Sequence, residues 1–79
     1  MVSRKQPARR LTPMQIRIVG VMCHDSRVSY RSIAAATGVG VRTVRMHVEQ
    51  LARLLPGNGN PLSRVALYAE RLLRLSQLP

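Results

Sequence analysis

The sequence of 79 residues predicts an all-α fold: one small domain over residues 11–79, preceded by a flexible basic arm over residues 1–10. Two observations predict this fold. Apolar residues recur at steps of three and four, which is the spacing of one face of an α-helix. Cap residues, prolines and glycines separate these periodic segments from one another. Together these signals predict four helices, at about residues 13–24, 30–37, 41–55 and 61–76.

The first helix should begin directly after Thr12. Thr12 can cap it, Pro13 suits the first helical position, and Gln15 stands where a capping box requires glutamine or glutamate. The apolar positions that follow at helical spacing are Met14, Ile18, Val21 and Met22. We expect this helix to pack on the core through that face and to end near residue 24.

The second and third helices are separated by a short turn that contains two glycines. Ser29 can cap the segment 30–37, and Gly38 follows it where a left-handed residue is wanted. Gly40 is then a tolerable cap for the longer helix 41–55. A short helix, a turn of three or four residues and a longer helix form a helix-turn-helix.

The helix 41–55 has two unlike faces. At about 100° per residue, one side carries mostly charged residues and the opposite side is apolar. The outward residues are Arg42, Arg45, Met46, Glu49 and Arg53. The inward residues are Val41, Val44, Val48, Leu51, Ala52 and Leu55. One side can therefore pack on a core while the other meets a partner, and such a helix fits a DNA major groove.

The fourth helix should start at Asn60-Pro61, after a break rich in proline, glycine and asparagine. Its docking face should consist of Leu62, Val65, Ala66, Ala69, Leu72 and Leu73. Four apolar residues lie outside that face: Leu67, Tyr68, Leu75 and Leu78. They favour a homodimer, although single exposed leucines are common and often have no partner.

The charge of the chain points to a polyanionic partner. Thirteen lysines and arginines against three acids give a formal net charge of +10, which favours nucleic acid first and an anionic membrane surface second. An Arg-rich codon bias would explain arginine in place of lysine, but not the small number of acids. In the arm, Arg4, Lys5, Arg9 and Arg10 either follow a DNA backbone or belong to a solubilising tail.

The residues that catalysis or metal binding needs are few and scattered. Cys23 has no cysteine or histidine at metal spacing, and no nucleophile motif, paired carboxylate or phosphate loop is present. We expect no enzymatic activity, no metal and no cofactor, and a semi-buried Cys23. No apolar run is long enough to span a membrane, so we expect no membrane association and a cytoplasmic location in a bacterium or phage-infected cell, associated with the nucleoid.

Three stretches, LTPMQIRIV, SYRSIAAATGVGVRTVRMHVEQLARLL and SRVALYAERL, resemble the LuxR/GerE-type (NarL- and FixJ-like) DNA-binding domain of bacterial transcription factors. The most specific part is the run from Thr43 to Val48. The resemblance implies a four-helix domain whose second and third helices form the helix-turn-helix and whose fourth helix dimerises. It also implies a structural role for His47. Region four of sigma factors is similar in Ser29-Tyr30, although the fourth helix and His47 favour the LuxR/GerE type.

Specific roles follow for the outward residues, from side-chain chemistry and from the resemblance. Arg45 suits a guanine edge, Met46 a thymine methyl group, and Glu49 a cytosine amino group. Glu49 is alternatively a salt-bridge partner of Arg45 or Arg53. The residues expected at phosphates are Tyr30, Arg31, Arg42, Thr43 and Arg53.

We therefore expect a sequence-specific transcriptional regulator that binds double-stranded DNA. Two alternatives remain at this point. One is an adaptor that uses the same scaffold to bind RNA polymerase or another regulator. The other is an architectural DNA binder with little sequence preference.

Overall fold

The computed structural model describes residues 11–25 and 27–77, and this part of the chain is helical and contains no strand. Its helices are α1 (Pro13–His24), α2 (Tyr30–Thr37), α3 (Val41–Ala52), α4 (Pro61–Leu67) and α5 (Ala69–Ser76). The predicted all-α class is confirmed, and so are the predicted bounds 13–24 and 30–37. The arm 1–10 lies outside the described residues.

The helix starts follow the capping signals of the sequence. The Thr12 hydroxyl accepts from the backbone N–H of Gln15 at 3.1 Å, and the Gln15 side chain accepts from the Thr12 N–H at 3.1 Å. Ser29 and Ser32 form the same reciprocal pair at the start of α2. Asn60 caps α4 through its side-chain oxygen. Each cap satisfies backbone donors that have no partner within the helix.

The turn between α2 and α3 depends on the conformation of Gly38. Its φ is +78°, and its N–H donates to the Ala34 carbonyl at 2.9 Å, which closes the last turn of α2. The Thr37 carbonyl accepts from Arg17 of α1 at 3.0 Å, so α1 is tied to the same turn. Gly40 caps α3 with φ −71° and without a side-chain hydrogen bond.

The third helix is shorter than predicted, since α3 ends at Ala52 and the predicted end is residue 55. The N–H groups of Leu54 and Leu55 donate to carbonyls three residues back, which tightens the chain into a turn. Pro56 disfavours a helical conformation in Leu55. The Arg64 guanidinium of α4 then donates to the carbonyls of Ala52 and Gly57, which holds the following loop.

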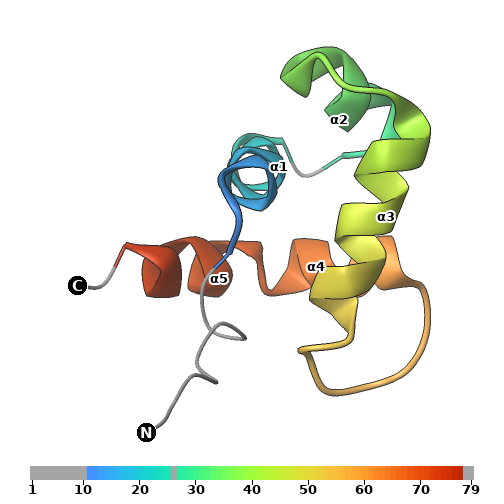
Figure 1. Cartoon of the computed structure of the whole chain (residues 1–79). Coiled ribbons are helices and arrows are strands. Elements are labelled where there is room, and N and C mark those ends of the chain that lie inside the picture. The colour runs from blue at the N-terminus through green and yellow to red at the C-terminus, as the bar shows by residue number, and fades with distance from the viewer. Residues whose placement is uncertain (1–10, 26, 78–79) are drawn as a thin grey trace, which may run out of the picture.

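The predicted helix 61–76 is two helices, α4 and α5, divided at Tyr68. Tyr68 has φ −101° and ψ 10°, and its N–H is shared between the carbonyls of Arg64 and Val65. The physical reason is packing on two partners, because α4 lies against α3 while α5 lies against α1 (Figure 1). The chain changes direction at one residue and continues.

The core is aliphatic, as the composition requires. Helix α2 packs on α1 and α3, and these two helices pack on α5 and α4, respectively (Figure 1). Each helix contributes buried side chains to the core. The buried apolar residues are Ile18, Val19, Met22, Ile33, Ala34, Val44, Val48, Leu51, Ala52, Val65, Ala69 and Leu72. The predicted docking face of the last helical segment is confirmed, because its other members, Leu62, Ala66 and Leu73, are partly buried against this core.

The two glycines of the turn should respond oppositely to the same substitution. Gly38→Ser should lower the free energy of unfolding by about 1 kcal/mol, because an L side chain is strained at positive φ. Gly40→Ser should raise it by about 0.5 kcal/mol, because the hydroxyl can cap α3 and the residue is less flexible when unfolded. A new Cβ has no neighbour within 4 Å at either site.

Urea unfolding followed by circular dichroism measures both variants. Each serves as the control for the other, since the residue introduced is the same. Equal changes of the same sign would contradict the different backbone conformations of the two glycines.

Candidate nucleic-acid interface

The predicted outer face of α3 is exposed. Arg42, Thr43, Arg45, Met46, Glu49 and Arg53 are all exposed, while Val44, Val48 and Leu51 on the opposite side are fully buried. The predicted inward position of Val41 is wrong, because 38% of its surface is exposed. Val41 is the first residue of the helix, beyond the reach of the core. Leu55 follows the helix end and is half-buried.

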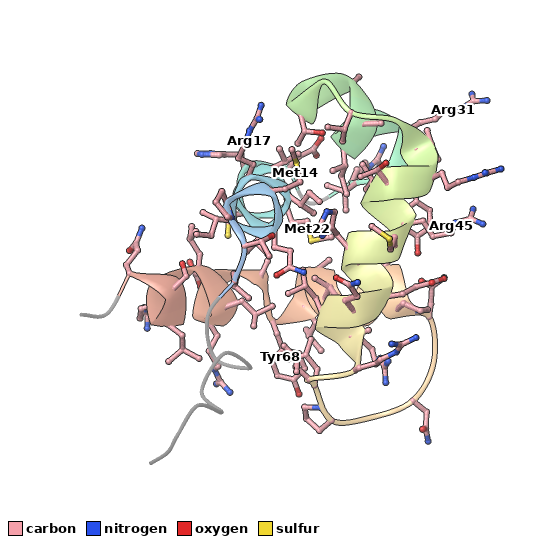
Figure 2. The ribbon with its side chains drawn as sticks, in the orientation of Figure 1. Met14, Arg17, Met22, Arg31, Arg45 and Tyr68 are labelled. Atoms are coloured by element: carbon pink, nitrogen blue, oxygen red, sulfur yellow. The ribbon has the colours of Figure 1, made fainter. Side chains whose placement is uncertain are left out.

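The start of α2 brings Tyr30 and Arg31 beside this face. Arg31 is exposed, and Figure 2 shows Arg31 and Arg45 projecting on the same side of the molecule, away from Arg17. The Arg45 guanidinium carbon lies over the Tyr30 ring, 5.0 Å from its centroid, within the range of a cation–π interaction. Residues of two helices therefore form one surface.

The Tyr30 side chain is half-buried at the edge of the core. Burial raises the pKa of its hydroxyl above the ordinary value; the positive charge of Arg45 lowers the pKa, and the negative charge of Glu49 raises it. These causes place the hydroxyl in the field of both charged residues.

Glu49 makes no ion pair with Arg45 or Arg53 in the described part of the chain, so the salt bridge considered from the sequence is not formed. Its carboxylate is exposed between these arginines. A carboxylate in this state is available to accept hydrogen bonds from an incoming ligand.

A buried amide links α1 to α3. Gln15 is 7% exposed, and its Nε2 donates to the Gln50 side-chain oxygen at 3.2 Å. The same Nε2 lies 3.4 Å from His47 Nδ1, which accepts in the tautomer that carries its proton on Nε2. Sequence reasoning identified Gln15 only as a capping residue. The signal that could have revealed the link is a polar residue on an otherwise apolar helix face.

The residues expected at a dimer interface are not equivalent. Leu67 and Leu75 are 77% and 54% exposed, as an interface residue must be in the monomer. Tyr68 is half-buried against the core, so most of its packing is internal, and Arg71 lies 5.8 Å from its ring centroid. Leu78, like Arg4, Lys5, Arg9 and Arg10 of the arm, lies outside the described residues.

The described residues also bear on a metal site, on Cys23 and on a membrane span. Residues 11–25 and 27–77 contain no group of three histidine, cysteine or acidic side chains that could hold a metal ion. Cys23 is exposed, so its predicted semi-buried position is wrong; it lies on the side of α1 away from Ile18 and Met22. Over the same residues, every helix is too short or too polar to cross a bilayer.

The pKa of Tyr30 tests the electrostatics of this surface. Glu49→Gln should lower that pKa, because it removes a nearby negative charge and keeps the side-chain shape. Glu70→Gln, on α5, is the matched control and should leave it unchanged. An NMR titration of the Tyr30 ring carbons measures this pKa in both variants. A higher Tyr30 pKa in Glu49→Gln would contradict the position of Glu49 near the Tyr30 hydroxyl.

The same titration has a consequence for stability. The folded-state pKa of Tyr30 is raised, so its contribution to stability is present below pH about 10 and is lost as the pH rises through that pKa. Glu49→Gln should make this loss smaller and complete it at lower pH, because it lowers only the folded-state pKa of Tyr30.

Comparisons with protein-family models, with curated proteins and with solved structures give no match to this chain. The side chains that α2 and α3 bring together are therefore the basis on which a function can be proposed.

Proposed function

We propose that the protein is a sequence-specific transcriptional regulator that binds double-stranded DNA by inserting α3 into the major groove. The observation that carries the proposal is the division of α3 into two faces. Arg42, Arg45, Met46 and Glu49 are exposed along one side, and the opposite side is buried in the core. In this proposal α2 and α3 are a helix-turn-helix of the LuxR/GerE type.

The dimensions and chemistry of the two partners agree. A major groove about 12 Å wide admits one α-helix with its side chains. Arg45 can donate two hydrogen bonds to guanine, Met46 can contact a thymine methyl group, and Glu49 can accept from a cytosine amino group. These three residues read bases in the proposed complex.

Phosphate contacts come from the margins of the same surface. Tyr30 and Arg31 lie in the first turn of α2, Arg42 and Thr43 lie in the first turn of α3, and Arg53 follows its end. Tyr30 is half-buried, and the other four residues are exposed. Such contacts fix the register of a protein on the duplex without reading sequence. The net charge of +10 adds a general attraction to the backbone.

The proposal includes a homodimer and a bacterial or phage setting. The exposed Leu67 and Leu75 favour a contact between two copies, which would bind a DNA site with twofold symmetry. The protein then acts in the cytoplasm on nucleoid DNA, and without a cofactor or catalytic step.

Selection from a random duplex library, followed by binding measurements, tests the function. A palindromic enriched motif supports a specific dimer. Uniform binding to all duplexes would instead indicate an architectural binder, and the absence of DNA binding would favour the adaptor that contacts RNA polymerase or another regulator. The ratio of specific to random-duplex affinity at one salt concentration separates these outcomes.

Two arginines of α3 should behave differently in that assay. Arg45→Ala should weaken the free energy of binding to the selected site by about 1 to 3 kcal/mol, and it should relax the preference at one base pair. Arg42→Ala, the matched control on the same helix, should weaken binding to all sequences about equally and reduce the salt slope by about one. Unchanged specificity in Arg45→Ala would contradict the proposed base contact.

The arm gives a separate prediction. Deletion of residues 1–10 should weaken binding to every duplex alike and reduce the salt dependence by nearly one for each phosphate that the arm neutralises. Fluorescence anisotropy over a series of salt concentrations measures the slope. An unchanged slope would show that the arm makes no phosphate contacts, and it would then be a solubilising tail.

A further inference from the structure

We infer that Tyr30 is a positioning residue for Arg45: its ring holds the Arg45 guanidinium at the outer face of α3, ready to meet a base edge. The inference rests on the proposed function, and it assigns to a residue of α2 part of the sequence preference of α3.

The Tyr30 ring occupies a fixed position. Tyr30 is the first residue of α2, directly after the Ser29 cap, and the reciprocal bonds between Ser29 and Ser32 hold this turn of the helix. The ring is half-buried and packs against the core. A tyrosine has only two side-chain torsions, so packing on the core leaves the ring little freedom.

Arg45, by contrast, is a long exposed side chain. Immobilising such a side chain on binding costs conformational entropy. The guanidinium carbon lies 5.0 Å from the Tyr30 ring centroid, so part of this ordering is already present in the free protein. The Arg45 side chain is thereby preorganised before DNA arrives.

The partner of Arg45 also leaves its hydrogen-bond donors available. A guanidinium has five N–H donors, and an aromatic ring attracts the cation through its π-electrons without providing a conventional acceptor. An ion pair with Glu49 would instead occupy the donors that guanine O6 and N7 require, and that pair is absent from the described part of the chain. The contact with Tyr30 therefore orients Arg45 and keeps it competent to read a base.

The second arginine–tyrosine pair in the described residues is a useful reference. The Arg71 guanidinium carbon lies 5.8 Å from the Tyr68 ring centroid, near the start of α5. Because this pair includes no residue of α2 or α3, a substitution of Tyr30 should leave it unchanged.

Two substitutions separate the ring from the hydroxyl. Tyr30→Leu removes the ring as well as the hydroxyl, and it should bind the selected site about two- to fivefold more weakly than Tyr30→Phe, which lacks only the hydroxyl. This additional loss should fall on the base pair that Arg45→Ala relaxes. The two Tyr30 variants should bind random duplex equally, because both lack the hydroxyl of the proposed phosphate contact. Tyr30→Phe keeps the ring and should retain the sequence preference.

A double-mutant comparison tests whether Tyr30 acts through Arg45. In the Arg45→Ala background, Tyr30→Leu and Tyr30→Phe should bind the selected site equally. In the Arg42→Ala background, the two- to fivefold difference between these two variants should persist, because Tyr30 and Arg42 act independently. Additive losses in both backgrounds would overturn the positioning role.

NMR of the free protein gives a readout that needs no DNA, and the wild type alone can already contradict the inference. The Arg45 side-chain protons should be shifted upfield by the Tyr30 ring current in the wild type and lose this shift in Tyr30→Leu, while those of Arg71 do not change. Arg45 protons at their unstructured positions in the wild type would overturn the inference, even if Tyr30→Leu fails to fold.

The outcomes distinguish this inference from the proposed function. If the wild type prefers no duplex sequence, the proposed function fails, and the positioning role fails with it. If the wild type has a preferred site and Tyr30→Leu binds it unchanged, only the positioning role is overturned. If Tyr30→Phe and Tyr30→Leu lose affinity equally for all sequences, Tyr30 is a phosphate contact through its hydroxyl and does not position Arg45.

Discussion

The burial of Val44, Val48 and Leu51 fixes the rotation of α3, and the candidate interface depends on that rotation. All three side chains are fully buried, against α1, α2 and α4. A shift of one residue would turn the helix by about 100° and expose part of this apolar face. The cost of exposing aliphatic surface, about 25 cal/mol per Å², thus holds the charged face outward.

Polar side chains of α1 determine the positions of α2 and α3. Arg17 donates to the last carbonyl of α2, and Gln15 reaches His47 and Gln50 on α3. Hydrogen bonds are directional, and leaving the buried Gln15 amide without a partner would cost about 1 to 3 kcal/mol. Apolar packing determines which face of α3 is buried, whereas these bonds determine its position relative to α1 and α2. The Gln15 link also accounts for the half-buried position of His47.

Helix starts could be predicted from the sequence because their causes are local. Thr12, Ser29 and Asn60 each bond to backbone N–H groups two or three residues away. The end of α3 has a local cause in Pro56, but the bond from Arg64 to the Ala52 carbonyl is not local. The division at Tyr68 depends on packing against two different helices, which no local pattern contains. In the candidate interface, periodicity predicted the outward residues of α3. The contact between Tyr30 and Arg45 was not predicted, because it joins two helices and depends on their crossing.

Glu49 places one carboxylate on the otherwise basic exposed face of α3. Charge attraction alone would favour an uninterrupted row of arginines, because each phosphate contact adds affinity for any duplex. A carboxylate among them lowers that affinity everywhere except where it meets a donor, and the cytosine amino group is such a donor in the major groove. In the proposed complex, the Glu49 carboxylate, which makes no ion pair within the described residues, would oppose a mismatched duplex. In this complex, Glu49 therefore lowers the affinity of α3 for DNA in general and increases its discrimination between sequences. The preorganised Arg45 supplies a favourable base contact beside it.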